Sequence, residues 1–232
     1  MELIGDGIRE AFKLIFSGDR QVYTIAARSL VISGLATLIG LAIGAGVGLF
    51  LGLRSFAGRN LVLGLVNTGM ALPPVVVGLF VFLFLTRGGP FGDLRLLFTP
   101  AAMVIAQSII ATPIIAGLTA AAIQGLHPKL RLQILALGAS RWQYAWLMFR
   151  EARLPLLAAV MLAFGAAIHE VGASLMVGGN IKDETRVLTT ATVLETQKGN
   201  FETAIALSLI LLLVMYAVNL ALTFVQQRRP SG

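Results

Sequence analysis

GLHPKLRLQILALGASRWQYAWLMFREARLP, residues 125–155, is the stretch that decides the fold. It mixes charged and apolar residues and lies between two long apolar segments. The pattern predicts a short helix over 130–137, a break at Gly138, and a second helix that Ser140 caps and that ends at Glu151. A loop of this length between two spans is rarely only a connector. We expect it to dock on another protein; the alternative is a helix pair lying on lipid headgroups.

The composition around this stretch is that of a membrane protein. Of 232 residues, 57% are hydrophobic and 12% are charged, and the mean hydropathy is +0.86. An average soluble domain has about 25% charged residues. The chain has no cysteine, which excludes disulfides and thiolate metal sites. The sequence therefore predicts an all-α integral membrane protein with a single domain over residues 1–232.

Several apolar segments are long enough to cross a bilayer, which takes about 20 residues. They predict five transmembrane helices, over residues 29–53, 61–85, 101–124, 154–177 and 203–225. Residues 1–21 precede them and place Ile4, Ile8 and Ala11 at helical spacing. We expect an amphipathic helix there, packed as an N-terminal arm or lying on lipid.

Glycines and prolines predict where a span packs closely against a neighbour and where it bends. Gly40, Gly44, Gly48 and Gly52 fall on one helix face, where a neighbouring helix can approach closely, within the chain or from another subunit. Pro73–Pro74 removes two helix hydrogen bonds and is expected to kink or break the second span.

Polar residues inside the spans are candidates for a translocation pathway. Ser108 and Thr112 lie beside Pro113 in the third span, and they are expected to face a pathway or to bond a neighbouring backbone. His169 and Glu170 lie about 15 residues into the fourth span, where charge is costly, so a functional role competes with a buried structural pair. The second histidine of HExxH is missing, which excludes a zinc protease of that type.

Charge predicts which way the chain crosses the membrane. One side would hold a single acid, Glu151, and nine basic residues: Arg54, Arg59, Lys129, Arg131, Arg141, Arg150, Arg153, Arg228 and Arg229. The segments on the other side are nearly balanced. Because basic loops stay inside the cell, residues 125–153 and the C-terminus are expected in the cytoplasm and the N-terminus outside. This placement explains the net charge of +7 without nucleic acid.

The central stretch resembles the signature loop of permease subunits of type I ABC importers. That motif ends in Gly-Ala, a spacer and Leu-Pro, which match Gly138, Ala139, Leu154 and Pro155. The motif opens with Glu-Ala-Ala, whereas this chain has Leu132, Gln133 and Ile134. The resemblance covers roughly residues 25–225 and implies the fold of these permeases (MetI-like).

A second match indicates which group of these importer permeases the chain resembles. HEVGASLMVGGNIKDETRVLTTATVLE, residues 169–195, is similar to the corresponding region of tungstate permeases, relatives of the molybdate and sulfate permeases. The resemblance implies ATP-driven import of a tetrahedral oxyanion, tungstate first, with molybdate or sulfate next.

The resemblance also implies partners and site residues. Two copies of the chain would form a pore in a bacterial or archaeal cytoplasmic membrane, two ATP-binding subunits would hold ATP and Mg²⁺, and an extracytoplasmic binding protein would deliver the anion. The chain itself would bind no cofactor or metal and catalyse no reaction, and it has no GxxxxGK[ST] phosphate loop. The residues expected to couple to the ATPase are Leu132, Leu135, Gly138, Ala139, Ser140 and Arg141.

The implied pathway is lined with hydroxyls and few acids. Its candidate residues are Ser108, Thr112, His169, Glu170 and Ser174. Because an ionised Glu170 suits an anion route poorly, we expect it to sit apart or to pair with a cation, for which Arg186 is the candidate. The alternative function is a secondary transporter or channel that works alone, but the chain is short for that and has no evident internal repeat.

Overall fold

The computed structural model describes residues 2–227, which form helices joined by loops and contain no strand. The elements in order are α1 (Glu2–Phe16), α2 (Arg20–Leu53), α3 (Arg59–Met70), α4 (Pro74–Leu85), the short 3₁₀ helix η1 (Gly92–Leu94), α5 (Pro100–Gly125), α6 (Pro128–Ala136), α7 (Arg141–Glu151), α8 (Arg153–Ile168), α9 (Gly172–Gly178), α10 (Leu188–Gln197) and α11 (Phe201–Gln227). The all-α prediction is confirmed.

Three helices, α2, α5 and α11, are individually long and apolar enough to cross a membrane. Two bent pairs pass the same criterion together, α3 with α4 and α7 with α8, which raises the number of spans to as many as five. The predicted first span is the apolar part of a longer helix, because α2 begins at Arg20, where the Asp19 carboxylate accepts a hydrogen bond from the Val22 N–H at 3.0 Å.

The N-terminal helix is amphipathic and packed, as expected, but shorter than residues 1–21. It ends at Phe16, since Gly18 adopts a φ of +69° and Asp19 already caps the next helix. α1 packs against α11, and a Cβ at Gly7 would lie 2.5 Å from the Ile205 side chain.

Two predicted spans are discontinuous. Residues 61–85 are not one helix, because the chain turns by 98° between α3 and α4 at the Pro73–Pro74 pair. Residues 154–177 are also not continuous, since α8 ends at Ile168 and α9 begins at Gly172. The second break, which places His169 and Glu170 between helices rather than within one, was not predicted.

The glycine face of α2 packs within the chain, against α5. A Cβ at Gly44 would lie 2.6 Å from the Thr112 carbonyl oxygen, and one at Gly48 would lie 2.5 Å from that of Ala116. A Cβ at Gly52 would meet the Ile123 side chain at 2.6 Å. These approaches leave no room for a side chain, so the glycines bring two helix backbones together.

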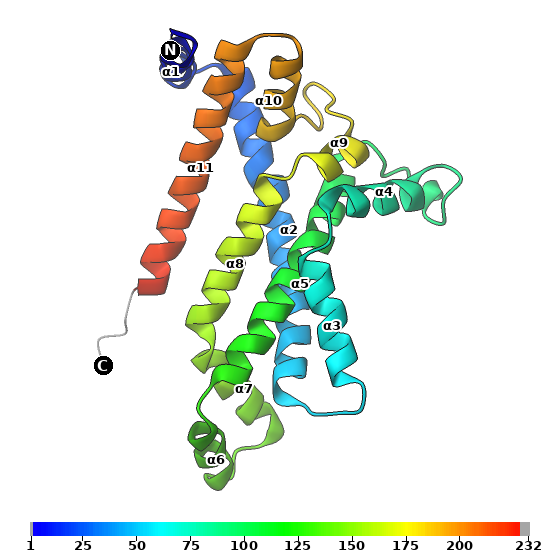
Figure 1. The fold of residues 1–232 in the computed structure, drawn as a ribbon, viewed down its shortest axis with the longest axis vertical. Coiled ribbons are helices and arrows are strands. Elements are labelled where there is room, and N and C mark those ends of the chain that lie inside the picture. Colours follow the sequence, from blue (N-terminus) through cyan, green and yellow to red (C-terminus); the bar gives the residue numbers. More distant parts are fainter. Residues whose placement is uncertain (1, 228–232) are drawn as a thin grey trace.

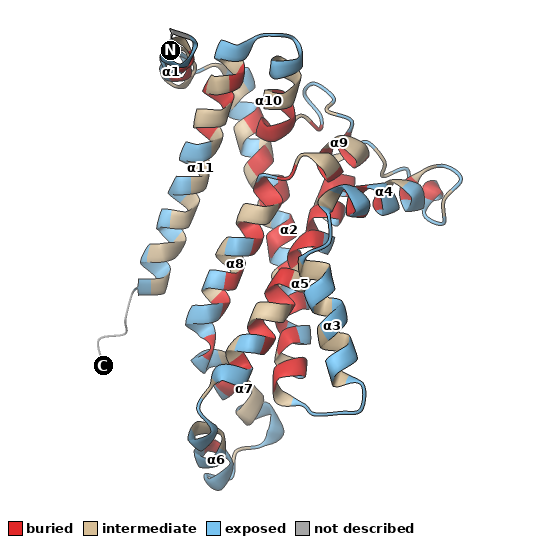
Figure 2. Ribbon diagram, in the orientation of Figure 1, coloured by how far each residue is buried: buried red, intermediate tan, exposed pale blue. Residues whose placement is uncertain are grey.

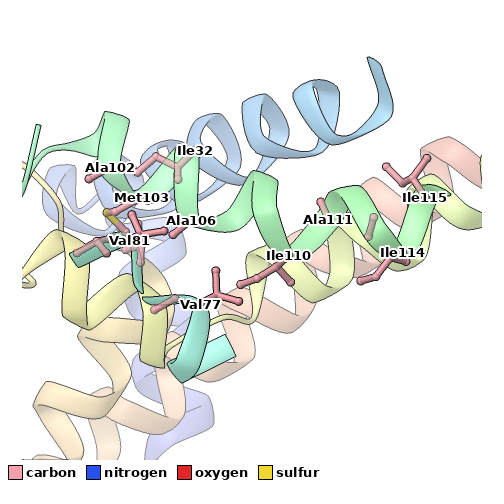
Figure 3. Packing of buried hydrophobic residues seen from close by; sticks show 14 of the residues in the cluster. Ile32, Val77, Val81, Ala102, Met103, Ala106, Ile110, Ala111, Ile114 and Ile115 are labelled. Atoms are coloured by element: carbon pink, nitrogen blue, oxygen red, sulfur yellow. The ribbon is translucent and has the colours of Figure 1, made fainter. Parts of the chain in front are cut away.

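α5 is the central helix and contacts α2, α3, α4, α8 and α9. The main buried cluster follows it, as Figure 3 shows for Met103, Ala106, Ile110 and Ile114, with Val77 from α4 beside them. In Figure 2 burial runs along α5 and the facing sides of α2 and α8, while most of α11 is exposed or intermediate.

The long helices run roughly side by side, and loops gather at their two ends (Figure 1). α1 and α10 lie at one end, together with the start of α11, and α6 and α7 lie at the other. α2 and α11 both run from the first end towards the second, so α11 ends far from the N-terminal helix, although it stops short of α6 and α7. Arg228 and Arg229, which were counted in the charge prediction, lie outside the described residues.

Candidate functional site

The end formed by α6 and α7 contains the predicted docking loop, and its local geometry follows from a few caps. The His127 Nδ1 accepts a hydrogen bond from the Lys129 N–H at 3.1 Å and starts α6. Gly138 has a φ of +74°, which favours glycine, and it separates the two helices as predicted. Ser140 and Gln143 form a reciprocal capping box, with distances of 3.3 and 2.8 Å. The predicted cap at Ser140 is therefore confirmed.

A small buried cluster holds this loop on the bundle. Ile134 of α6 and Met148 of α7 pack against Ile123, near the end of α5, and against Ala152. The Arg131 guanidinium donates a hydrogen bond to the Ile123 carbonyl at 2.7 Å. The loop is therefore a folded unit with one inner face fixed to the transmembrane helices.

The opposite face of α6 is apolar and open. The exposed fractions are 67% for Leu132, 55% for Leu135 and 87% for Leu137. Gly138, Ser140 and Arg141 are exposed beside them. Ala139 differs from the other predicted coupling residues because it is half-buried and packs on the inner cluster. Large apolar groups grouped at the surface mark an interaction site, and Leu137, which was not predicted, is the most exposed of them.

The hydroxyls predicted along the third span bond to their own helix. Ser108 donates to the Val104 carbonyl at 2.7 Å, and Thr112 donates to the Ser108 carbonyl at 2.7 Å. Ser108 is buried and Thr112 is half-buried. Both hydroxyl groups therefore bond to backbone carbonyls, which is one of the two interpretations left open for these residues.

Ser174 lies one helix turn into α9 and is joined to α5. Its hydroxyl oxygen accepts a hydrogen bond from the Gln107 amide at 3.3 Å, and both side chains are at least 98% buried. The Gln107 Oε1 is buried with no hydrogen-bond partner among the described residues. This contact joins α9 to α5 through Gln107, which is adjacent in the sequence to Ser108.

Glu170 is buried at the break between α8 and α9, with 6% of its surface exposed. Its Oε1 accepts a hydrogen bond from the Ala173 N–H at 2.8 Å, and its backbone carbonyl accepts one from Thr189 at 3.2 Å. The carboxylate therefore starts α9, and the carbonyl that the break releases is satisfied by α10. Both bonds satisfy backbone groups that have no helical partner where α8 ends and α9 begins.

The proposed pairing of Glu170 with Arg186 is wrong. The Arg186 guanidinium donates instead to the side-chain and backbone oxygens of Asn180, at 3.3 and 3.4 Å. His169 is exposed, whereas Glu170, its neighbour in the sequence, is buried. One feature of the sequence could have revealed the capping role. Glu170 lies three residues before Ala173, and acidic residues are common at the start of a helix.

Within residues 2–227 no group of three or more His, Asp or Glu side chains could hold a metal ion. The site residues predicted from the sequence contribute to two features of the described chain: an exposed apolar face beside α6, and small buried polar contacts at the helix breaks.

Comparison with known proteins points in one direction. The family described as "Binding-protein-dependent transport system inner membrane component" matches residues 44–229. The tungstate uptake system permease protein TupB of Peptoclostridium acidaminophilum is 39% identical over 98% of this chain and 100% of its own length. A probable anion ABC transporter permease of Haloferax volcanii is 42% identical over 90% of this chain and 92% of its own.

A solved structure shares the fold. The crystal structure of a bacterial ABC transporter involved in the import of the acidic polysaccharide alginate matches with a TM-score of 0.75, covering 96% of this chain and 84% of that one. At 19% sequence identity the match concerns the fold alone.

Proposed function

The chain belongs to the family of binding-protein-dependent transport system inner membrane components, and from this premise we propose that it is the pore subunit of an ATP-driven importer of tungstate. It is a permease subunit of an anion ABC importer. The choice of tungstate over molybdate or sulfate rests on the likeness to TupB and on residues 169–195.

The observation that carries the proposal is the exposed apolar face of α6. A permease that is driven by a separate ATP-binding subunit needs such a contact surface, whereas a channel that works alone does not. Leu132, Leu135 and Leu137 lie on a rigid two-helix unit at one end of the bundle. We propose that this face inserts into a groove of an ATP-binding subunit, which holds ATP and Mg²⁺. A helix in an apolar groove is a common mode of recognition.

Two copies of the chain would enclose the pore, with two ATP-binding subunits below and a binding protein above. Closure of the ATP-binding subunits would move α6 and α7, and the inner cluster around Ile134 and Met148 would transmit that motion to α5. The pore would then change from inward-facing to outward-facing. The proposed pathway includes the hydroxyl groups of Ser108 and Thr112 on α5 and of Ser174 on α9.

The proposal also fixes an orientation, with the α6–α7 end in the cytoplasm and α1 outside. Because the chain has no cysteine, a single cysteine in place of exposed Leu137 reports on the α6–α7 end, and one in place of exposed Phe91 reports on the loop between α4 and α5, which the charge prediction places outside. An impermeant thiol reagent added to intact cells should label the Phe91→Cys variant and spare Leu137→Cys. The reverse pattern would contradict the orientation.

The function is tested by transport. The chain is reconstituted in vesicles with the ATP-binding subunit and the binding protein encoded beside it, and uptake of tungstate, molybdate and sulfate is compared with and without ATP. We expect tungstate uptake that needs ATP. Uptake by the chain alone, without the ATP-binding subunit, would support a secondary transporter instead, and a preference for sulfate would contradict the assignment to tungstate.

A further inference from the structure

An apolar groove lies on the outside of the bundle, between residues 41–49 of α2 and the helix α7. Its volume is about 410 Å³. It is lined by Leu41, Ala42, Ala45, Gly46, Leu49, Trp142, Ala145, Trp146, Phe149 and Leu156. The proposed docking face on α6 uses none of these residues, so the groove has no role in the function described above.

The groove contains both tryptophans of the chain. Trp142 is 81% exposed and Trp146 is 57% exposed, and the Trp146 ring stacks on Phe149 at 6.1 Å between centroids. Exposed tryptophans next to a transmembrane helix are typical of the membrane–water interface, where one part of the ring is apolar and the other is wet. α2 supplies the opposite wall from within its transmembrane length.

α7 is only thinly attached to the bundle. Met148 is its one buried residue, and it faces the inner cluster rather than the groove. The groove side of α7 is therefore open, and an apolar occupant would complete the packing between α7 and α2.

Positive charge lies on the segment of chain that links two lining residues of the groove. Arg150 and Arg153 are both exposed and fall, in the sequence, between the lining residues Phe149 and Leu156. They line a second cavity of about 430 Å³, together with Leu147, Glu151 and Leu154, and α7 contributes to both cavities. The end of α11 reaches the same level, since the Gln226 amide donates to the Leu154 carbonyl at 3.3 Å. Two arginines against one glutamate, at the level where a transmembrane helix ends, suit an anionic headgroup.

We propose that this groove binds an anionic phospholipid of the cytoplasmic leaflet. An acyl chain lies along Leu41–Leu49 beneath the two tryptophans, and the phosphate lies on Arg150 and Arg153. Basic pockets between helices at the cytoplasmic side commonly hold such headgroups. The leaflet, but not the groove, rests on the orientation given under the proposed function.

Tryptophan fluorescence tests the proposal directly, because both tryptophans lie in the groove. The full chain is reconstituted in phosphatidylcholine vesicles, and brominated phosphatidylglycerol or brominated phosphatidylcholine is added in increasing proportion. Bromines on the acyl chain quench a tryptophan that they touch. An arginine beside an anionic headgroup contributes about 1 kcal/mol, which is about fivefold in binding. We expect half-maximal quenching at a proportion of phosphatidylglycerol at least about fivefold lower.

Matched variants separate the headgroup from the acyl chain. Arg150→Gln with Arg153→Gln should remove the preference for phosphatidylglycerol, whereas Arg87→Gln with Arg95→Gln, in the loop between α4 and α5, should retain it. Gly46→Leu should fill the groove and reduce quenching by both lipids, and Gly34→Leu on the same helix should not. A Cβ at either glycine meets nothing within 4 Å, so both variants should fold.

Equal quenching by the two lipids would overturn the selection of an anionic headgroup. Absence of quenching by either would overturn lipid occupancy and assign the groove to a second copy of the chain or another protein. Because the measurement needs no transport, a chain that imports its anion yet shows equal quenching loses this proposal and keeps the proposed function.

Discussion

The α2–α5 interface and the outer face of α6 both provide contact surfaces, but the first is built from the smallest residues and the second from large apolar ones. Along α2 the contacts are made by Gly40, Gly44, Gly48 and Gly52, and a single added carbon would lie within 3 Å of an atom of α5 at each. On the outer face of α6 and directly after it, the residues are large leucines, Leu132, Leu135 and Leu137, each more than half exposed.

The difference shows which contacts are complete in one chain. In lipid, helices gain little from the hydrophobic effect and associate through close packing, which small residues permit. At the aqueous end the hydrophobic effect operates, and large apolar groups that remain in water gain free energy only when a partner covers them. Each of the predictions below tests one side of this comparison.

The largest expected effect is on the open side. Leu135→Glu places a charge in the proposed ATPase contact, and loss of a central apolar anchor commonly costs 2 kcal/mol or more, which is about thirtyfold. ATP-dependent uptake should fall by at least that factor, while the thermal unfolding midpoint of the purified chain stays unchanged.

The neighbouring residue provides the control for that variant. Ile134 is 8% exposed and faces the inner cluster, so Ile134→Glu should lower the unfolding midpoint as well as transport. If Leu135→Glu transports normally, the docking role of the face is contradicted; if it unfolds as Ile134→Glu does, the face is part of the core.

On the packed side, one methyl group should distinguish two glycines of α2. Gly48→Ala would place its Cβ 2.5 Å from the Ala116 carbonyl oxygen, whereas Gly46→Ala meets nothing within 4 Å. Overpacking costs about 1–3 kcal/mol, so Gly48→Ala should lower the unfolding midpoint in detergent. Gly46→Ala should match or slightly exceed the parent chain, since alanine favours helix over glycine. Equal midpoints for the two variants would contradict the close helix contact.

The sequence predicted what depends on local chemistry. The break at Gly138, the Ser140 cap and the in-chain packing of the α2 glycines follow from residue type and spacing, and all are present. The Pro73–Pro74 break was also predictable, but not its angle of 98°, which depends on how α4 packs against α9.

What the sequence could not predict depends on contacts between distant segments. Arg186 bonds to Asn180, and its carbonyl accepts from Arg28, which is 158 positions away. That contact fixes the loop before α10, and it removes Arg186 from reach of Glu170. The exposed tryptophan groove likewise needs α2 and α7 side by side, and no local pattern reports such a neighbour.

A smaller effect on stability is expected at Glu170, whose hydrogen bond to the start of α9 is, like the glycine contacts, complete within one chain. Glu170→Ala removes the acceptor for the Ala173 N–H, and loss of a helix-start acceptor costs about 1 kcal/mol. Glu170→Gln retains an oxygen in the same place and should unfold at nearly the parent temperature. If Glu170→Gln unfolds normally but no longer transports, then the charge itself acts in the pathway and the structural interpretation is wrong.

The smallest effect lies outside the membrane-spanning helices, at the turn between α10 and α11. The Asn200 amide and the Lys198 ammonium bond to the Glu195 carboxylate at 2.7 and 2.8 Å, and these contacts lower the pKa of Glu195 from its ordinary value of 4.5. A lowered pKa in the folded state means that the stabilisation is present above pH 4.5 and is lost as the pH falls through the lower, folded-state value. Asn200→Ala should therefore lower the unfolding midpoint slightly at pH 7, and the gap to the parent chain should shrink below pH 4.5. A gap that stays constant with pH would mean that Asn200 contributes through the turn's backbone and not through this carboxylate.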